Sequence, residues 1–206
     1  MIEIFNRDCM EAMAEMPDKA FDLAICDPPY GIGVNGMNMG SRQTIRPDKR
    51  TWDAETPPPE YFRELRRVSK HQIIWGGNYF DLPPSRCFVI WDKGETMYDR
   101  DFAECEQAWT SFDRSARMFK QNPMQLDRIH PTQKPVKLYE WLLKNYAKKG
   151  DKILDTHLGS GSIAIACYNL DFDLTAFEID AEYYEGALKR LEEHKKQQRL
   201  FDNEPI

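Results

Sequence analysis

Residues 152–167 read KILDTHLGSGSIAIAC, and this stretch decides the fold. Its first four residues form a short apolar run that predicts a buried strand. A glycine-containing turn follows, and the residues from Ile163 to Cys167 predict a helix. Glycines at a turn from strand to helix let a ligand approach the backbone closely, as in nucleotide-binding turns. No phosphate-binding lysine follows Gly161, so the turn does not resemble a triphosphate-binding loop. It predicts binding of an adenosine compound without a loop that holds phosphates.

The rest of the chain repeats this alternation of strand and helix. Helical stripes of apolar residues occupy 139–146 and 184–191, and a third helix is expected to start within residues 56–60, where prolines fit only the first turn. We therefore expect an α/β protein with a three-layer Rossmann-like fold, a mostly parallel seven-stranded sheet and helices on both faces, in one domain over residues 1–206. Besides Lys152–Asp155, the predicted strands are Ile2–Phe5, Phe21–Cys26, Gln72–Trp75, Cys87–Trp91, Phe102–Thr110 and Leu174–Glu178.

Composition excludes several classes of protein. Of the 206 residues 41% are hydrophobic and 30% are charged, and no apolar run approaches the roughly 18 to 20 residues of a membrane helix. The N-terminus reaches acidic residues at once and has no basic, then apolar, leader, so we expect a cytoplasmic protein without membrane association. The five cysteines are odd in number and widely spaced, which predicts neither a disulfide framework nor a zinc site, and no metal is expected.

Charge is distributed unevenly along the chain, whose net charge is -6. Two basic segments stand out, and each alone is typical of a solvated loop. The first lies in residues 31–56, the longest segment without periodicity, which we expect to be a lid or binding loop inserted in the domain. The bases of this segment are Arg42, Arg46, Lys49 and Arg50; the second segment contains Arg114, Arg117, Lys120, Arg128 and Lys134.

The strand Phe21–Cys26 ends in the sequence Asp27-Pro28-Pro29-Tyr30. Ligands of parallel sheets bind beyond the carboxyl ends of the strands, and the two prolines stiffen this turn and remove backbone donors. Asp27 and the Pro28 carbonyl could accept both hydrogens of an exocyclic amino group while Tyr30 stacks on its ring. The simpler alternative is a proline turn that only ends the strand.

An acid follows the glycine turn at the expected distance. Glu178 ends the next strand, about 20 residues further on, where an acid conventionally binds ribose hydroxyls. Together with the glycines, it strengthens the prediction of an adenosine cofactor.

These residues, in this order, resemble the S-adenosylmethionine-dependent amino-methyltransferases of DNA, specifically the β class, in which the Asp-Pro-Pro-Tyr motif precedes the glycine motif. The resemblance covers nearly the whole chain, including His130-Pro131-Thr132-Gln133-Lys134-Pro135 at the methionine end of the pocket and the turn at residues 6–9 near the adenine. It implies a methyltransferase with the catalytic residues Asp27, Pro28, Pro29 and Tyr30. The implied S-adenosyl-L-methionine site comprises Asp8, Cys9, Asp27, Thr132, Lys134, Asp155, His157, Gly159, Ser160, Gly161, Ser162, Glu178 and Ile179.

The implied reaction is methyl transfer to the N6 amino group of adenine in DNA. Since that group is paired inside a duplex, the base must first be flipped out. The basic segments then supply the expected phosphate contacts, namely Arg42, Arg46, Lys49, Arg50, Arg114, Arg117, Lys120 and Arg128. The target-recognition segment is very short, at about 114–129. A homodimer and a cognate restriction enzyme are partners that the sequence leaves open.

Three other functions share parts of this pattern. Methylation of the N4 amino group of cytosine needs the same pocket, although aspartate rather than serine at position 27 favours adenine in this family. RNA and protein methyltransferases mostly carry the glycine motif first. A catalytically silent binding subunit would be expected to have lost Asp27 or the glycine turn. One departure from the family pattern is His157, which replaces an aromatic residue and is either a cofactor contact or a satisfied polar residue.

Overall fold

The computed structural model describes residues 1–33, 53–99, 103–124, 128–130 and 132–202. Most of the predicted insertion at 31–56 lies outside the described residues. The same holds for four predicted DNA contacts, Arg42, Arg46, Lys49 and Arg50.

The described residues build one sheet in the order β1-β8-β7-β2-β3-β5-β4-β6. Neighbouring strands run parallel except where β5 pairs with β3 and with β4. The mostly parallel sheet predicted from the sequence is therefore confirmed. The strands are β1 (Ile2–Phe5), β2 (Phe21–Cys26), β3 (Ser69–Trp75), β4 (Phe88–Asp92), β5 (Cys105–Thr110), β6 (Arg117–Lys120), β7 (Lys152–Asp155) and β8 (Asp173–Phe177).

The prediction of seven strands was wrong, because the sheet has eight. The additional strand, β6, lies inside the segment 114–129 that we assigned to target recognition, and it pairs with β4 at the edge of the sheet. Three of its four residues are exposed, so it lacks the alternation of buried and exposed side chains that marks a strand in sequence. Only its backbone pairing reveals it.

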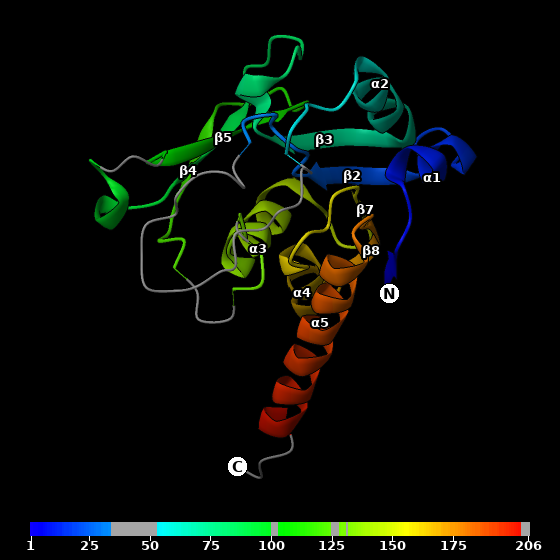
Figure 1. The fold of residues 1–206 in the computed structure, drawn as a ribbon, viewed down its shortest axis with the longest axis vertical. Coiled ribbons are helices and arrows are strands. Elements are labelled where there is room, and N and C mark those ends of the chain that lie inside the picture. Colours follow the sequence, from blue (N-terminus) through cyan, green and yellow to red (C-terminus); the bar gives the residue numbers. More distant parts are fainter. Residues whose placement is uncertain (34–52, 100–102, 125–127, 131, 203–206) are drawn as a thin grey trace.

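Helices cover both faces of the sheet, as predicted (Figure 1). The helices α1 (Cys9–Glu15) and α2 (Pro59–Val68) pack one core, which contains Met13 and Leu65. On the other face, the helices α3 (Val136–Tyr146), α4 (Ser162–Asn169) and α5 (Ala181–Asp202) pack the second core around Leu142 and Ile163. Two short 3₁₀ turns, η2 (Gly77–Tyr79) and η3 (Glu95–Met97), complete the elements. These layers confirm the three-layer α/β fold.

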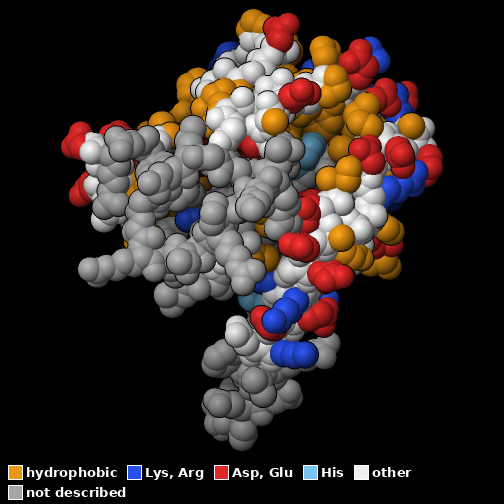
Figure 2. Space-filling model, viewed as in Figure 1, with side chains coloured by type: hydrophobic (Ala, Val, Ile, Leu, Met, Phe, Trp, Pro, Cys, Tyr) orange, Lys and Arg blue, Asp and Glu red, His pale blue; other side chains and the backbone are white. Residues whose placement is uncertain are grey.

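The C-terminal part of α5 projects from the body of the molecule. Figure 2 shows acidic and basic side chains mingled along it, and the ion pairs Lys189–Glu193 and Lys195–Glu192 join successive turns. Such pairs stabilise an exposed helix by a few tenths of a kcal/mol each. No helix among the described residues is both long and apolar enough to cross a membrane.

The first and the last strand of the chain's described residues are neighbours in the sheet, where β1 and β8 run side by side with Ile4 opposite Ala176. Beyond their carboxyl ends the backbone N–H of Glu178 donates to the carbonyl of Phe5 over 3.0 Å. The Asn6 amide nitrogen donates to the carbonyls of Glu178 and Ile179, at 2.8 and 3.1 Å. The turn after β1 and the acid after β8 thus lie together beyond the carboxyl ends of these two strands.

Candidate active site

The turn after β2 is held by a buried carboxylate. Asp53 accepts the backbone N–H groups of Tyr30 and Gly31 on one carboxylate oxygen, at 2.7 and 3.1 Å. Its side chain is 3% exposed. Sequence reasoning missed Asp53, because an acid in a loop of mixed composition gives no signal until its backbone partners are known. It fixes the two prolines and Tyr30 relative to Asp27.

Asp27 holds two donors, one on each carboxylate oxygen. The Tyr30 hydroxyl donates to Oδ1 over 2.6 Å, and the ammonium of Lys134 donates to Oδ2 over 2.5 Å. Lys134 comes from the segment before α3, and its side chain is 2% exposed. The structure thus brings together two of the predicted site segments that lie 107 positions apart in the sequence. Burial raises the pKa of Asp27 above its usual range, against the opposing charge of Lys134.

Two residues that the sequence analysis did not single out extend this contact into a charged chain. Lys134 Nζ lies 3.0 Å from Glu106 Oε2, and Glu106 Oε1 lies 2.9 Å from Lys93 Nζ. Burial disfavours the ionised form of Glu106, but the ammonium groups of Lys134 and Lys93 outweigh it and lower the pKa to about 2. Negative and positive groups therefore alternate along Asp27, Lys134, Glu106 and Lys93.

The ring of Tyr30 is part of an aromatic cluster. Tyr79 stacks on it with ring centroids 5.0 Å apart and planes 14° from parallel, and Phe80 meets it edge-on. Gly76 lies so close that a Cβ there would come within 2.2 Å of the ring, and its φ of +71° also favours glycine. Tyr79 is 45% exposed, which makes it the solvent side of the stack.

The glycine turn after β7 combines two different uses of glycine. Gly159 has a φ of +52°, and a Cβ there would meet nothing nearer than the ring of His130 at 3.8 Å. At Gly161, with a φ of +72°, a Cβ would meet Ala187 of α5 at 3.0 Å. At Gly159 a Cβ would therefore make an ordinary van der Waals contact with His130, whereas Gly161 permits close packing against α5.

Glu178 lies directly at this turn. One of its carboxylate oxygens accepts the backbone N–H of Gly159 at 2.8 Å, and the other accepts that of Asp180 at 2.9 Å. Burial raises the pKa of Glu178 despite these donors. Its neighbour Ile179 is 69% exposed.

Asp155 is the most strongly perturbed carboxylate in this region. It is 2% exposed and accepts the backbone N–H of His157 at 3.0 Å. Burial raises the pKa of Asp155 to about 8, which the His157 N–H opposes and the charges of Asp27 and Glu178 reinforce. The three acidic groups at the carboxyl ends of β2, β7 and β8 are thus close enough to interact electrostatically.

His157 is buried in a small polar chain. Its Nδ1 lies 2.9 Å from the hydroxyl of Thr156, which is 2.7 Å from the hydroxyl of Tyr61, and the Tyr61 ring meets the imidazole edge-on. Burial lowers the pKa of His157 to about 4, so the imidazole is neutral at pH 7. Of the two interpretations offered above, this geometry favours the satisfied polar residue.

The two serines of the turn bond to α5. Arg190, 8% exposed, donates to the carbonyl of Ser160 at 3.1 Å and to the hydroxyl of Ser162 at 2.9 Å. The serine hydroxyls lie 3.2 Å apart. The sequence analysis missed Arg190. The available signal was its position three residues after Ala187, which places both residues on the same, buried face of the helix. Arg190 fixes the turn from the side of the helix.

The remaining predicted cofactor residues lie around this turn. The His130 ring packs against Tyr183 at an interplanar angle of 57°, and its Nδ1 lies 3.1 Å from the Thr132 hydroxyl. The same ring lies beside Gly159. Asp8 caps α1 by accepting the N–H groups of Met10 and Glu11. Burial raises the pKa of the Cys9 thiol to about 12, so Cys9 is un-ionised.

The predicted DNA contacts within the described residues are not gathered around Asp27. The guanidinium groups of Arg114 and Arg117 bond to Asn145, near the C-terminal end of α3, which leads to the start of β7. Lys120 pairs with Glu95 at 3.0 Å, and Arg128 donates to the His130 carbonyl at 3.2 Å. Among these, Arg128 is nearest to the predicted cofactor segment.

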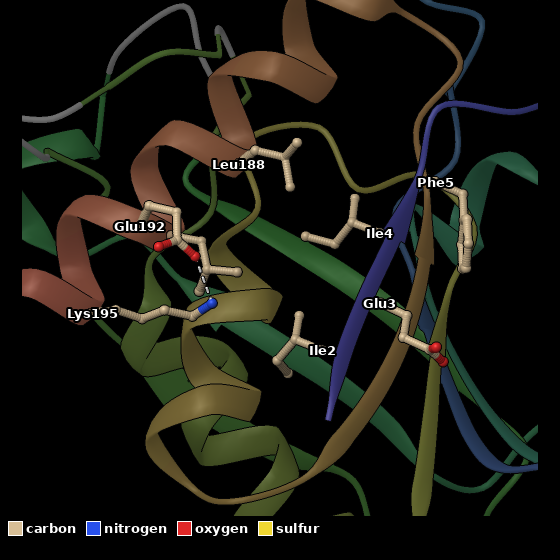
Figure 3. Close-up of a pocket in the computed structure, with 8 residues that line it drawn as sticks. Ile2, Glu3, Ile4, Phe5, Leu188, Glu192 and Lys195 are labelled. Carbon is tan, nitrogen blue, oxygen red and sulfur yellow. Dashed lines mark hydrogen bonds and ion pairs between the residues drawn. The ribbon is translucent and has the colours of Figure 1, made fainter.

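A separate cavity of about 360 Å³ lies between β1 and α5. Figure 3 shows Ile2 and Ile4 pointing from β1 toward Leu188, while Glu3 and Phe5 point to the other side of the strand. It is lined by none of the side chains predicted for catalysis or cofactor binding. The cluster at the carboxyl ends of β2, β7 and β8 is therefore the candidate site.

A family model described as DNA methylase matches residues 85–189, just over half of the chain. The chain belongs to the DNA methylase family. This DNA methylase is 25% identical over 209 residues to "Putative methylase YubD" of Escherichia coli (strain K12), across 93% of this chain and 90% of that protein. It is 22% identical over 245 residues to "Type II methyltransferase M2.DpnII" of Streptococcus pneumoniae, across 92% and 89%.

Solved structures of methyltransferases share its fold. The M1.HpyAVI-SAM complex superposes with a TM-score of 0.61 at 21% identity, covering 93% of this DNA methylase and 100% of that chain. The PvuII DNA methyltransferase, described as cytosine-N4-specific, gives a TM-score of 0.62 at 12% identity, covering 98% and 93%. At these identities the likeness establishes the fold alone.

Proposed function

We propose that this DNA methylase transfers a methyl group from S-adenosyl-L-methionine to the N6 amino group of adenine in DNA, as a β-class enzyme. One observation carries the proposal: Asp27, in an Asp-Pro-Pro-Tyr turn, lies at the carboxyl end of β2 with its carboxylate bonded to Tyr30 and Lys134. Beside it, β7 leads into a glycine turn in which the Gly159 N–H donates to the Glu178 carboxylate.

The residues present fit the cofactor. Gly159 has a φ of +52°, which favours glycine, and the Glu178 carboxylate lies at that turn, where it can accept hydrogen bonds from ribose hydroxyls. The carboxyl groups of Asp27 and Glu178 follow β2 and β8, the strands on either side of β7, and negative charge there suits a cationic sulfonium compound. When bound, the cofactor supplies an electrophilic methyl group.

The chain's own residues orient the amino group that receives the methyl. A carboxylate offers about four lone-pair positions, and Tyr30 and Lys134 use two of those on Asp27, so it can accept an N–H from the base. The Pro28 carbonyl is the proposed acceptor for the second hydrogen. Preorganised acceptors of this kind orient a weak nucleophile and stabilise the positive charge that develops on it.

The second candidate is methylation of the N4 amino group of cytosine. It is favoured by the fold shared with the PvuII enzyme, which is described as cytosine-N4-specific. The same acceptors would serve either amino group. We favour adenine because position 27 holds aspartate rather than the serine of the cytosine-type motif.

Product analysis tests the proposed reaction. We expect DNA incubated with the purified protein and S-adenosylmethionine to contain N6-methyladenine by mass spectrometry of its nucleosides, and DNA incubated without the cofactor to contain none. N4-methylcytosine in its place would establish the second candidate. DNA that gains neither nucleoside would contradict the proposed function.

The cofactor site is tested at Glu178. Replacing it by alanine removes the acceptor at the turn and the partner of the Gly159 N–H, so we expect binding of S-adenosylmethionine to weaken by about 1 to 3 kcal/mol. Calorimetry measures this loss. Glu185→Ala, an exposed acid on α5, is the matched control and should bind normally. Undiminished binding by Glu178→Ala would place the ribose site elsewhere.

A further inference from the structure

Each carboxylate oxygen of Asp27 already accepts one protein donor in this structure. The Tyr30 hydroxyl lies 2.6 Å from Oδ1 and the Lys134 ammonium lies 2.5 Å from Oδ2. Both donors lie in a part-buried setting, where the loss of an acceptor is costly, most of all for a charged donor. A base amino group that binds Asp27 adds a third donor to this carboxylate, and a second acceptor nearby would let one of the first two donors move away.

Glu106 on β5 lies within reach of both donors. A single oxygen, Oε2, is 3.0 Å from Lys134 Nζ and 3.5 Å from the Tyr30 hydroxyl. The 3.5 Å separation is too long for a strong hydrogen bond, so the hydroxyl is committed to Asp27 here and has Glu106 as its nearby alternative. A small rotation of the hydroxyl hydrogen and ring would exchange one acceptor for the other.

The position of Glu106 is itself fixed. Lys93 holds Oε1 at 2.9 Å, which leaves Oε2 directed toward Lys134 and Tyr30. Glu106 is 20% exposed on its side chain and Lys93 is 13% exposed. On the other side, the Lys134 ammonium lies over the rings of Tyr30 and Trp75, with centroids at 5.7 and 5.2 Å. Lys134 is thus confined between two carboxylates and two aromatic rings.

We infer that Glu106 is a positioning residue. When Asp27 accepts a hydrogen bond from the substrate amino group, Glu106 accepts the hydrogen bond of the Tyr30 hydroxyl and keeps its ion pair with Lys134. The inference rests on the proposed function. It assigns no contact between Glu106 and the substrate. Without Glu106, Lys134 and the Tyr30 hydroxyl would have Asp27 as their shared acceptor in this part of the described structure, and the amino group would have to share that carboxylate with both of them.

The test is a double-mutant cycle between Glu106→Gln and Tyr30→Phe. Glutamine keeps the size of the side chain and removes its charge, so we expect kcat for DNA methylation to fall by about 10- to 100-fold, the range for a lost hydrogen bond to a charged group. The dissociation constant for S-adenosylmethionine should stay within about twofold, because Glu106 acts through Asp27. In the Tyr30→Phe background the hydroxyl no longer competes for Asp27, so the same substitution should cost at least about threefold less.

Controls separate this role from a general effect on the fold. Glu104→Gln changes an exposed acid two residues earlier and should leave kcat unchanged. Glu106→Asp retains a charged acceptor, so its kcat should lie between the kcat of the wild type and that of Glu106→Gln. Thermal melting shows which variants fold, and if Glu106→Gln does not, the cycle is run with Glu106→Asp.

Two results would overturn the inference alone: a normal kcat for Glu106→Gln, or an equal loss with and without the Tyr30 hydroxyl. If the wild type methylates cytosine, the inference is tested by the same cycle on that product. If the wild type transfers no methyl group to DNA, the proposed function fails and the inference fails with it.

Discussion

Replacing Asp27 by asparagine is expected to lower kcat by about 100-fold or more, comparable to the loss of one preorganised electrostatic partner. The amide keeps the shape of the side chain, but it offers one acceptor oxygen in place of two and leaves Lys134 with Glu106 as its charged partner. Binding of S-adenosylmethionine should be largely retained. Single-turnover measurements with labelled methyl groups give the rate, and calorimetry gives the cofactor affinity.

Asp22→Asn is the matched control for this experiment. Asp22 lies on the same strand, β2, where it pairs with Lys70 at 2.6 Å, away from the carboxyl end that carries the site. Its replacement should leave kcat unchanged. Turnover close to wild type in the Asp27→Asn protein would remove Asp27 from the mechanism.

The second large effect is on stability, at Asp155. Burial raises the pKa of this carboxyl to about 8, whereas an unfolded aspartate titrates near pH 3.9. Between about pH 4 and 8 the folded protein therefore holds this proton more tightly than the unfolded chain, so wild-type stability falls as pH rises through that window. Asparagine does not titrate. We expect the melting temperature of Asp155→Asn to exceed that of the wild type by about 3 °C or more at pH 8, and the difference to shrink toward pH 4.

Calorimetric scans at several pH values check this pH dependence. Asp171→Asn is the control, because Asp171 is an exposed aspartate with a φ of 57°, a backbone conformation that asparagine tolerates. It should show no comparable trend. A stability difference for Asp155→Asn that is constant between pH 4 and 8 would contradict the raised pKa.

The sequence predicted the parts of the fold whose residues carry a local pattern. The bounds of β1, β2 and β7 agree with their predicted ranges, because each is an apolar run closed by a polar turn. The helix α1 was not predicted, since its seven residues are too few for a clear apolar stripe. The exposed edge strand β6 was missed for the reason given above.

The candidate site was predictable only in part. Five of the predicted residues stand in recognisable motifs, and the structure brings them together at the carboxyl ends of the parallel strands. They are Asp27, Tyr30, Lys134, Asp155 and Glu178. In contrast, Asp53, Lys93, Glu106 and Arg190 are charged residues whose partners come from distant segments. The sequence alone predicts an ordinary solvent-exposed charge at each of these positions, because their side chains become buried and paired only after the sheet has formed.

The pairing of β1 with β8 has a consequence for biosynthesis. β1 is made first, but its backbone partner follows about 170 residues later in translation, and the Phe5 carbonyl receives the Glu178 N–H only then. Contacts this distant in sequence form slowly, since a long loop must close before they stabilise anything. A nascent chain that ends before residue 173 has an unpaired first strand and no acid at the glycine turn. The proposed cofactor site is therefore incomplete until β8 and Glu178 have been made.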